Sequence, residues 1–211
     1  MKLFIQIPCL NEEYTLPAVI RDLPTEIEGI DKVYTLIIDD GSSDRTVEVA
    51  KNLRVDFIIR NASNLGLART YSKGLEACIL LGADVIVNTD GDNQYCGDDV
   101  KKIVKQVVEK KTDVVVGCRD IAGHKEFSRF KKLLQKIGSR VVRKLSGGDV
   151  PDAISGFRAI SREAAITFSV MSHFSYTIET LIQAGRSGLK IGWVPINTNP
   201  KLRSSRLFKS N

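Results

Sequence analysis

The sequence has few of the features that assign a chain to a class at once. In its 211 residues no apolar run reaches the ~20 residues that a membrane-spanning helix needs. The four cysteines stand far apart without a C-x-x-C pair, which argues against both a disulfide framework and a zinc site. Lys2 is followed directly by a strand-like run, so we expect no secretory signal. These absences favour a protein with reduced thiols that is dissolved in the cytoplasm or bound to a membrane surface.

The composition that remains is that of a globular domain with a basic surface. Hydrophobic residues make up 43% of the chain, which is enough to fill a core. The net charge of +6 favours an anionic partner such as a nucleotide, a nucleic acid or an acidic membrane surface. The sequence contains no evident repeat, low-complexity segment or linker. We therefore expect one domain that spans residues 1–211.

Short apolar runs alternate with segments of helical periodicity, a pattern typical of an α/β domain with a parallel sheet. The carboxyl ends of such strands meet at one edge of the sheet, where ligands bind. Strands are predicted over residues 3–7, 33–38, 56–59, 85–87, 114–117 and 190–196, and helices are predicted from Asn11, after Asp44, up to Leu81, after Asp98, after Ser161 and over residues 174–184.

The segment Val85–Tyr95, V-I-V-N-T-D-G-D-N-Q-Y, carries the candidate metal ligands of the chain. Its apolar run predicts a buried strand that ends in two carboxylates one residue apart, Asp90 and Asp92. Gly91 lets the backbone turn there, and Gln94 adds an amide oxygen. Oxygen ligands of this kind suit Mg²⁺ or Mn²⁺, which keep positions open for substrate phosphates. A capped turn without metal is the structural alternative.

Polar residues also follow the second and third predicted strands. Asp39 and Asp40 are adjacent carboxylates at a strand end, and they repel each other unless a cation or hydrogen-bond donors face them. A nucleobase N–H or a ribose hydroxyl would serve. The turn Asn64–Arg69 opens a helix whose amides could meet a phosphate, although an ordinary loop explains it equally well. Because G-x-G-x-x-G and Walker A patterns are absent, a nucleotide site here would use carboxylates and metal.

The segment Phe127–Leu145 predicts a basic amphipathic helix. Apolar residues line one face, and seven lysines and arginines crowd the rest. Such a helix can lie on an anionic membrane, or it can pack against the core with a solvated basic face. Nucleic-acid binding is less expected, because aromatic residues that could stack on bases are scarce in this segment.

Five motifs occur in order along the chain: P-C-L-N-E-E at Pro8–Glu13, I-I-D-D-G-S-S-D-R-T at Ile37–Thr46, N-L-G-L-A-R at Asn64–Arg69, T-D-G-D-N-Q-Y at Thr89–Tyr95 and D-A-I-S-G-F-R at Asp152–Arg158. Together they resemble the family 2 inverting glycosyltransferases of GT-A fold. The last motif is similar to the D-x-x-S-G-F-R of the dolichol- and polyprenyl-phosphate sugar synthases. The resemblance implies an α/β fold with a mixed, mostly parallel sheet flanked by helices. It also implies a nucleotide-sugar-binding half over about residues 1–97 and an acceptor-binding half over about residues 98–211.

The same resemblance implies roles for individual residues. The nucleotide sugar would be bound by Pro8, Leu10, Asn11, Glu12, Asp39, Asp40, Asn64, Gly66, Arg69, Asp90 and Gly91. Mg²⁺ or Mn²⁺ would be held by Asp90, Asp92 and Gln94 together with the donor diphosphate. The candidate catalytic residues are Asp92, Arg119 and Asp152, and the candidates for the acceptor phosphate are Arg119, Arg129, Ser155, Arg203 and Arg206.

The nature of the acceptor decides which of these residues the reaction needs. A lipid phosphate is already anionic near neutral pH and needs positive charge rather than a base, which Arg119, Arg129 and Arg203 would supply. The enzyme would then work at the cytoplasmic face of an anionic membrane. A saccharide hydroxyl acceptor would instead require a carboxylate base, for which Asp152 is the candidate. A non-catalytic nucleotide-binding protein is a further alternative, which the full set of carboxylates disfavours.

Overall fold

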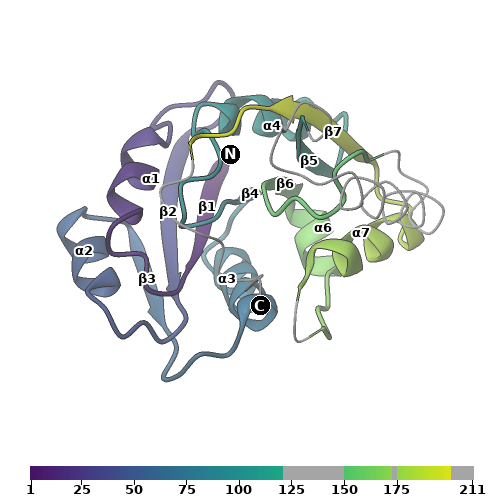
Figure 1. Cartoon of the computed structure of the whole chain (residues 1–211). Helices are drawn as coiled ribbons and strands as arrows, with labels where there is room; N and C mark the ends of the chain where they lie inside the picture. Colours follow the sequence, from purple (N-terminus) through teal and green to yellow (C-terminus); the bar gives the residue numbers. More distant parts are fainter. Residues whose placement is uncertain (121–149, 173–174, 201–211) are drawn as a thin grey trace.

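A seven-stranded sheet forms the centre of the molecule, with the strand order β3-β2-β1-β4-β6-β5-β7 (Figure 1). The computed structural model describes residues 1–120, 150–172 and 175–200. β6 runs antiparallel to β4 and β5, and the other neighbouring strands are parallel. The strands are β1 (Lys2–Cys9), β2 (Lys32–Asp39), β3 (Phe57–Arg60), β4 (Val85–Asn88), β5 (Val114–Arg119), β6 (Arg158–Ser161) and β7 (Ile191–Ile196).

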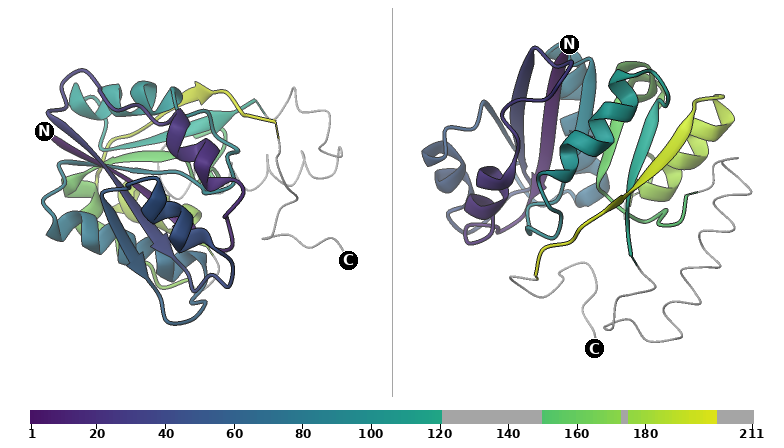
Figure 2. Two further views of the ribbon diagram at one scale, coloured as in Figure 1. Left: turned by 90° about the vertical axis from the view of Figure 1, so that its left-hand side faces the viewer. Right: turned by 90° about the horizontal axis from the view of Figure 1, so that it is seen from above.

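Helices cover both faces of the sheet (Figure 2). One core contains buried side chains of α1, α2 and α4, and the other contains those of α3, α6 and α7. Since both faces are covered, the central strand β4 is fully buried, and its first three residues are apolar. The helices are α1 (Leu16–Asp22), α2 (Thr46–Asn52), α3 (Leu67–Leu80), α4 (Asp99–Val108), α6 (Arg162–Thr167) and α7 (Thr177–Arg186).

One edge of the sheet gathers the chain segments that carry the sequence motifs. The carboxyl ends of β1 and β2 lie side by side, with Cys9 opposite Asp39. Asn88, the last residue of β4, pairs with Arg158, the first residue of the antiparallel β6. β5 ends at this edge with Arg119. The topology therefore brings the loops after β1, β2, β4 and β5 together with the loop before β6.

Most of the predicted elements are present, and one helix start was wrong. The expected helix at Asn11 begins at Leu16, because Asn11 has a positive φ of 56°, which ends the extended chain without starting a helix. The helix expected over residues 174–184 runs from Thr177 to Arg186. The predicted basic helix Phe127–Leu145 lies outside the described residues. Within the described part of the chain, no helix combines the length and the apolarity that crossing a membrane requires.

Candidate active site

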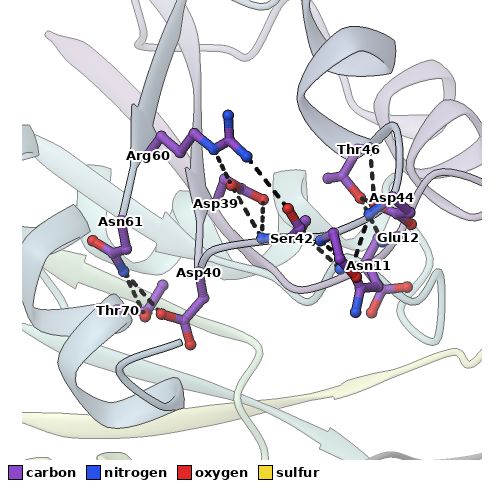
Figure 3. A network of polar contacts seen from close by, with 11 residues as sticks. Asn11, Glu12, Asp39, Asp40, Ser42, Asp44, Thr46, Arg60, Asn61 and Thr70 are labelled. Carbon is purple, nitrogen blue, oxygen red and sulfur yellow. Dashed lines mark hydrogen bonds and ion pairs between the residues drawn. The ribbon is translucent and has the colours of Figure 1, made fainter. Parts of the chain in front are cut away.

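The loops after β1 and β2 are locked together by side chains of the first two motifs (Figure 3). The Asn11 Oδ1 accepts hydrogen bonds from the backbone N–H of Ser43 at 2.8 Å and of Asp44 at 3.3 Å. In return, the Ser42 Oγ accepts from the Asn11 N–H at 2.8 Å, and the Thr46 Oγ1 accepts from the Glu12 N–H at 2.7 Å. These polar residues therefore have a structural task, which is to fix one loop against the other at the sheet edge.

Asp39 lies completely buried at the end of β2. Both of its carboxylate oxygens accept from the Ser42 N–H at 3.3 Å, and Oδ2 pairs with the Arg60 Nε at 3.3 Å (Figure 3). Arg60 stands directly opposite Asp39 in the register of β2 and β3. Sequence reasoning missed this arginine, because only the strand register brings it to the carboxylate. Its guanidinium places a positive charge beside this buried carboxylate.

Asp40 points in a different direction and shapes the next loop (Figure 3). Its carboxylate accepts from the Leu65 N–H at 2.8 Å, from the Gly66 N–H at 3.0 Å and from the Asn61 Nδ2 at 2.9 Å. The Asn64 Oδ1 also accepts from the Gly66 N–H. Protein oxygens therefore take up the amides of Leu65 and Gly66, which precede α3, and the expectation that amides of this helix start meet a phosphate stays a prediction. The contacts of Asn64, Gly66 and the exposed Arg69 with a nucleotide sugar remain predictions.

The loop after β4 carries the three predicted metal ligands. Asp90, Asp92 and Gln94 are partly exposed, and the Asp92 Oδ1 accepts from the Gln94 N–H at 3.1 Å. Gly91 brings this loop onto the end of β1, where an added Cβ would lie 3.0 Å from the Cys9 Sγ and 3.2 Å from the Glu12 Cγ. Only glycine lets the backbone approach that closely. The backbone of the loop consequently lies against Cys9 and Glu12 of the first motif.

The electrostatics of this edge favour a cation. The pKa of the buried Cys9 thiol is raised well above its usual value, first by burial and then by the negative charges of Glu12, Asp39, Asp90 and Asp44. These four carboxylates therefore lie close enough to Cys9 to act on its thiol, and their negative charge favours a cation nearby. Among the residues that the structure describes, no group of three or more His, Cys, Asp or Glu side chains forms a metal site by itself.

A buried polar network holds the loop before β6 against Asp90. The Asn88 Nδ2 donates to the Tyr176 hydroxyl at 2.7 Å and to the Gly156 carbonyl at 3.0 Å. The Gly156 N–H donates to the Tyr95 hydroxyl at 3.3 Å. A Cβ on Gly156 would lie 2.9 Å from the Tyr176 hydroxyl and 3.3 Å from the Asp90 Oδ1, so glycine is required by close packing. Sequence reasoning missed Asn88 and Tyr176, whose partners are distant along the chain.

Arg119 and Asp152 form a bidentate ion pair beside this network. The Asp152 carboxylate has no exposed surface and accepts from the Arg119 Nε at 2.7 Å and from its Nη2 at 3.1 Å. Burial alone would lower the pKa of Arg119, but Tyr95 and Asp152 outweigh it and leave that pKa raised. The guanidinium lies 6.0 Å from the centre of the Tyr95 ring. The Arg119 side chain is 14% exposed. Arg119 is thus a fixed positive charge next to the loop of Asp90 and Asp92.

The remaining predicted acceptor residues are either buried or undescribed. Ser155 has no exposed surface, and its Oγ accepts from the Phe157 N–H at 3.3 Å, which indicates a structural role in the turn. Arg158 is buried and donates to the carbonyls of Ser155, Ala153 and Thr177, so it ties this turn to α7. The three arginines predicted to contact phosphate from other segments lie outside the described residues: Arg129, Arg203 and Arg206.

The fold has counterparts among solved structures. It resembles glucosyl-3-phosphoglycerate synthase from Mycobacterium tuberculosis, solved with phosphoglyceric acid, with a TM-score of 0.74 and 20% identity over 97% of this chain and 73% of that one. A second structure of that synthase contains Mn²⁺, UDP and phosphoglyceric acid, with a TM-score of 0.72 and 19% identity over 97% and 72% of the two chains. The predicted GT-A fold, with a mixed and mostly parallel sheet between helices, is confirmed.

The chain belongs to glycosyl transferase family 2, which matches residues 4–168. UDP-N-acetylglucosamine--dolichyl-phosphate N-acetylglucosaminyltransferase from Methanococcus voltae is 31% identical over 93% of this chain and 85% of its own length. Polyprenol monophosphomannose synthase from Mycolicibacterium smegmatis is 25% identical over 97% of this chain and 80% of its own length. The protein is therefore a glycosyltransferase, and its resemblance to the polyprenyl-phosphate sugar synthases is confirmed.

Proposed function

We propose that this glycosyltransferase moves a sugar from a nucleotide sugar, of the GDP-mannose or UDP-hexose type, to a polyprenyl phosphate such as dolichyl or undecaprenyl phosphate. The relatives named for dolichyl-phosphate and polyprenol products support this acceptor. The structural observation that carries the proposal is the pair of Arg119 and Asp152. A base for a hydroxyl acceptor must reach that hydroxyl, whereas the Asp152 carboxylate is buried and bound on both oxygens by Arg119.

The donor would lie across the carboxyl ends of β1, β2 and β4. Asp39, oriented by Ser42 and Arg60, would accept a hydrogen bond from the nucleobase. Asp90, Asp92 and Gln94 would hold Mg²⁺ or Mn²⁺ together with oxygens of the donor diphosphate. When bound, the ion would act as a Lewis acid that stabilises the leaving nucleoside diphosphate. The negative charges of Glu12, Asp90 and Asp44 near Cys9 support this assignment, because they favour a cation at this edge of the sheet.

The acceptor phosphate is its own nucleophile. One of its oxygens would form a bond to the anomeric carbon while the bond from that carbon to the diphosphate breaks on the opposite face, which inverts the configuration. No proton has to leave the attacking oxygen. The obstacle is repulsion between two phosphate groups, which the fixed charge of Arg119 would offset. Because a polyprenyl chain stays in the bilayer, the enzyme would work as a peripheral protein at the cytoplasmic face of an anionic membrane.

The direct test is a panel of nucleotide sugars incubated with a short polyprenyl phosphate and Mn²⁺, with the glycolipid measured by mass spectrometry. We expect one donor to give a polyprenyl-phosphate sugar whose anomeric configuration is opposite to that of the donor. Retention of configuration would contradict the single displacement. No glycolipid with any donor would contradict the acceptor.

A further inference from the structure

The chain that follows β7 returns to the loop after β4. In Figures 1 and 2 the yellow segment beyond β7 runs back beside the teal loop between β4 and α4. Thr198 forms an isolated antiparallel bridge with Tyr95, and the Asn199 N–H donates to the Gln94 carbonyl at 2.9 Å. The Asn197 N–H donates to the Asp99 Oδ2 at 2.6 Å. Thr198 and Asn199 therefore pair with the backbone of the loop that carries Asp92 and Gln94, and Asn197 ties the segment to the start of α4.

The side chain of Asn199 adds two contacts that backbone pairing does not supply. Its Nδ2 donates to the Tyr95 carbonyl at 3.2 Å and to the Asn93 Oδ1 at 3.5 Å. Asn93 has a positive φ of 61°, a conformation that costs free energy and must be held by its surroundings. The one amide group thus bridges the residues on both sides of Gln94. On the other side of the loop, the Asp92 Oδ1 accepts from the Gln94 N–H.

We propose that Asn199 is a positioning residue that holds the Asp92–Tyr95 turn in the shape that directs Asp92 and Gln94 toward a divalent cation. This inference rests on the metal site of the proposed function. Without the Asn199 amide, the turn keeps its backbone bridge and the bond to the Gln94 carbonyl but loses the bonds to the Tyr95 carbonyl and to the Asn93 side chain. The two ligands then have to be ordered when the ion binds, and this cost appears as weaker metal affinity. Asn199 itself does not touch the substrate.

The test compares Asn199→Ala with the matched control Asn197→Ala. Asn197 is exposed, and its contact with Asp99 uses the backbone N–H, which alanine keeps. Mn²⁺ binding is measured from the free-ion signal in electron paramagnetic resonance, with saturating UDP and, in parallel, saturating GDP. UDP and GDP affinity without metal is measured by calorimetry, and the unfolding midpoint is recorded for every protein.

We expect Asn199→Ala to weaken Mn²⁺ binding about 3- to 10-fold, the range that the loss of a side-chain hydrogen bond produces. Asn197→Ala should stay within about twofold of the wild type. Nucleotide affinity without metal should remain unchanged in both variants, and the unfolding midpoint of Asn199→Ala should fall by no more than about 2–4 °C, which matches the loss of one hydrogen bond.

Two results would overturn the inference while leaving the metal site intact. One is unchanged Mn²⁺ affinity in Asn199→Ala. The other is a parallel loss of metal-free nucleotide affinity and thermal stability, which would indicate a general structural role. Failure of the wild type to bind Mn²⁺ with either nucleotide would instead overturn the proposed metal site itself.

Discussion

Replacing Asp152 by asparagine separates the two roles that its carboxylate could have. The substitution keeps the shape of the side chain and removes its charge. One oxygen remains to accept from Arg119, so one of the two charge-assisted bonds, at 2.7 and 3.1 Å, is lost. A hydrogen bond to a charged group contributes about 1.5–3 kcal/mol. If this free energy no longer holds Arg119 in its present position, kcat/KM for the acceptor phosphate should drop roughly 10- to 150-fold.

The size of this drop in kcat/KM does not by itself exclude that Asp152 is a general base, because loss of general-base catalysis lowers the rate by a similar ~10²- to 10⁴-fold. The pH profile and a double variant make the distinction. If Asp152 only positions Arg119, the acidic limb of kcat/KM should have the same shape in the wild type and in Asp152→Asn. Asp152→Asn should also add little to Arg119→Gln, since both variants disable the same group.

The assay is the initial rate of glycolipid formation with varied polyprenyl phosphate. Asp98→Asn is the matched control, because Asp98 forms a surface pair with Lys101 at 3.3 Å and its side chain is 77% exposed. That variant should retain the wild-type rate, as surface pairs contribute little. Disappearance of the acidic limb in Asp152→Asn, or a fully additive double variant, would refute the positioning role and favour a hydroxyl acceptor.

Three further predictions follow from the donor site and the basic surface. Asp92→Asn should lower kcat by orders of magnitude because it removes a charge from the metal shell, and wild-type turnover in excess EDTA would contradict this. Asp39→Ala should weaken nucleotide affinity in calorimetry, whereas Asp40→Ala should mainly lower the unfolding midpoint, since Asp40 binds the amides of Leu65 and Gly66. Equal effects of the two variants on affinity would refute the division of roles. The wild-type protein should sediment with anionic vesicles more than with neutral ones and lose this binding in high salt, because its net charge is +6 and exposed charges are screened. Equal sedimentation with both vesicles would argue against the membrane surface.

Features encoded by neighbouring residues could be predicted from the sequence. The apolar run of β4 and the two aspartates that follow it lie within one segment, so both the buried strand and the turn that carries carboxylates at its end were predicted. The helix expected at Asn11 was wrong because the positive φ of that residue and its bonds to Ser43 and Asp44 depend on a loop about thirty positions away.

Contacts between residues that are far apart along the chain could not be predicted from the sequence. The partners of Asp39 and Asp40 were left open, because Arg60 reaches Asp39 only through the register of β2 and β3, and the amides that hold Asp40 come from the loop after β3. The contacts of Asn199 with the loop of Gln94 likewise depend on where the chain goes after β7. Polar residues of this kind show no periodicity, so no pattern in the sequence indicates their partners.

The central claim, that the acceptor is a lipid phosphate, is tested most directly by offering the enzyme two acceptors that differ in one group. A short polyprenyl phosphate and the corresponding polyprenol are mixed in equal amounts with the active donor and Mn²⁺, and both glycolipids are measured by mass spectrometry. The account predicts that the sugar is found on the phosphate alone. Transfer to the polyprenol at a comparable rate would contradict it, because that acceptor must lose a proton and the buried carboxylate of Asp152 is bound to Arg119.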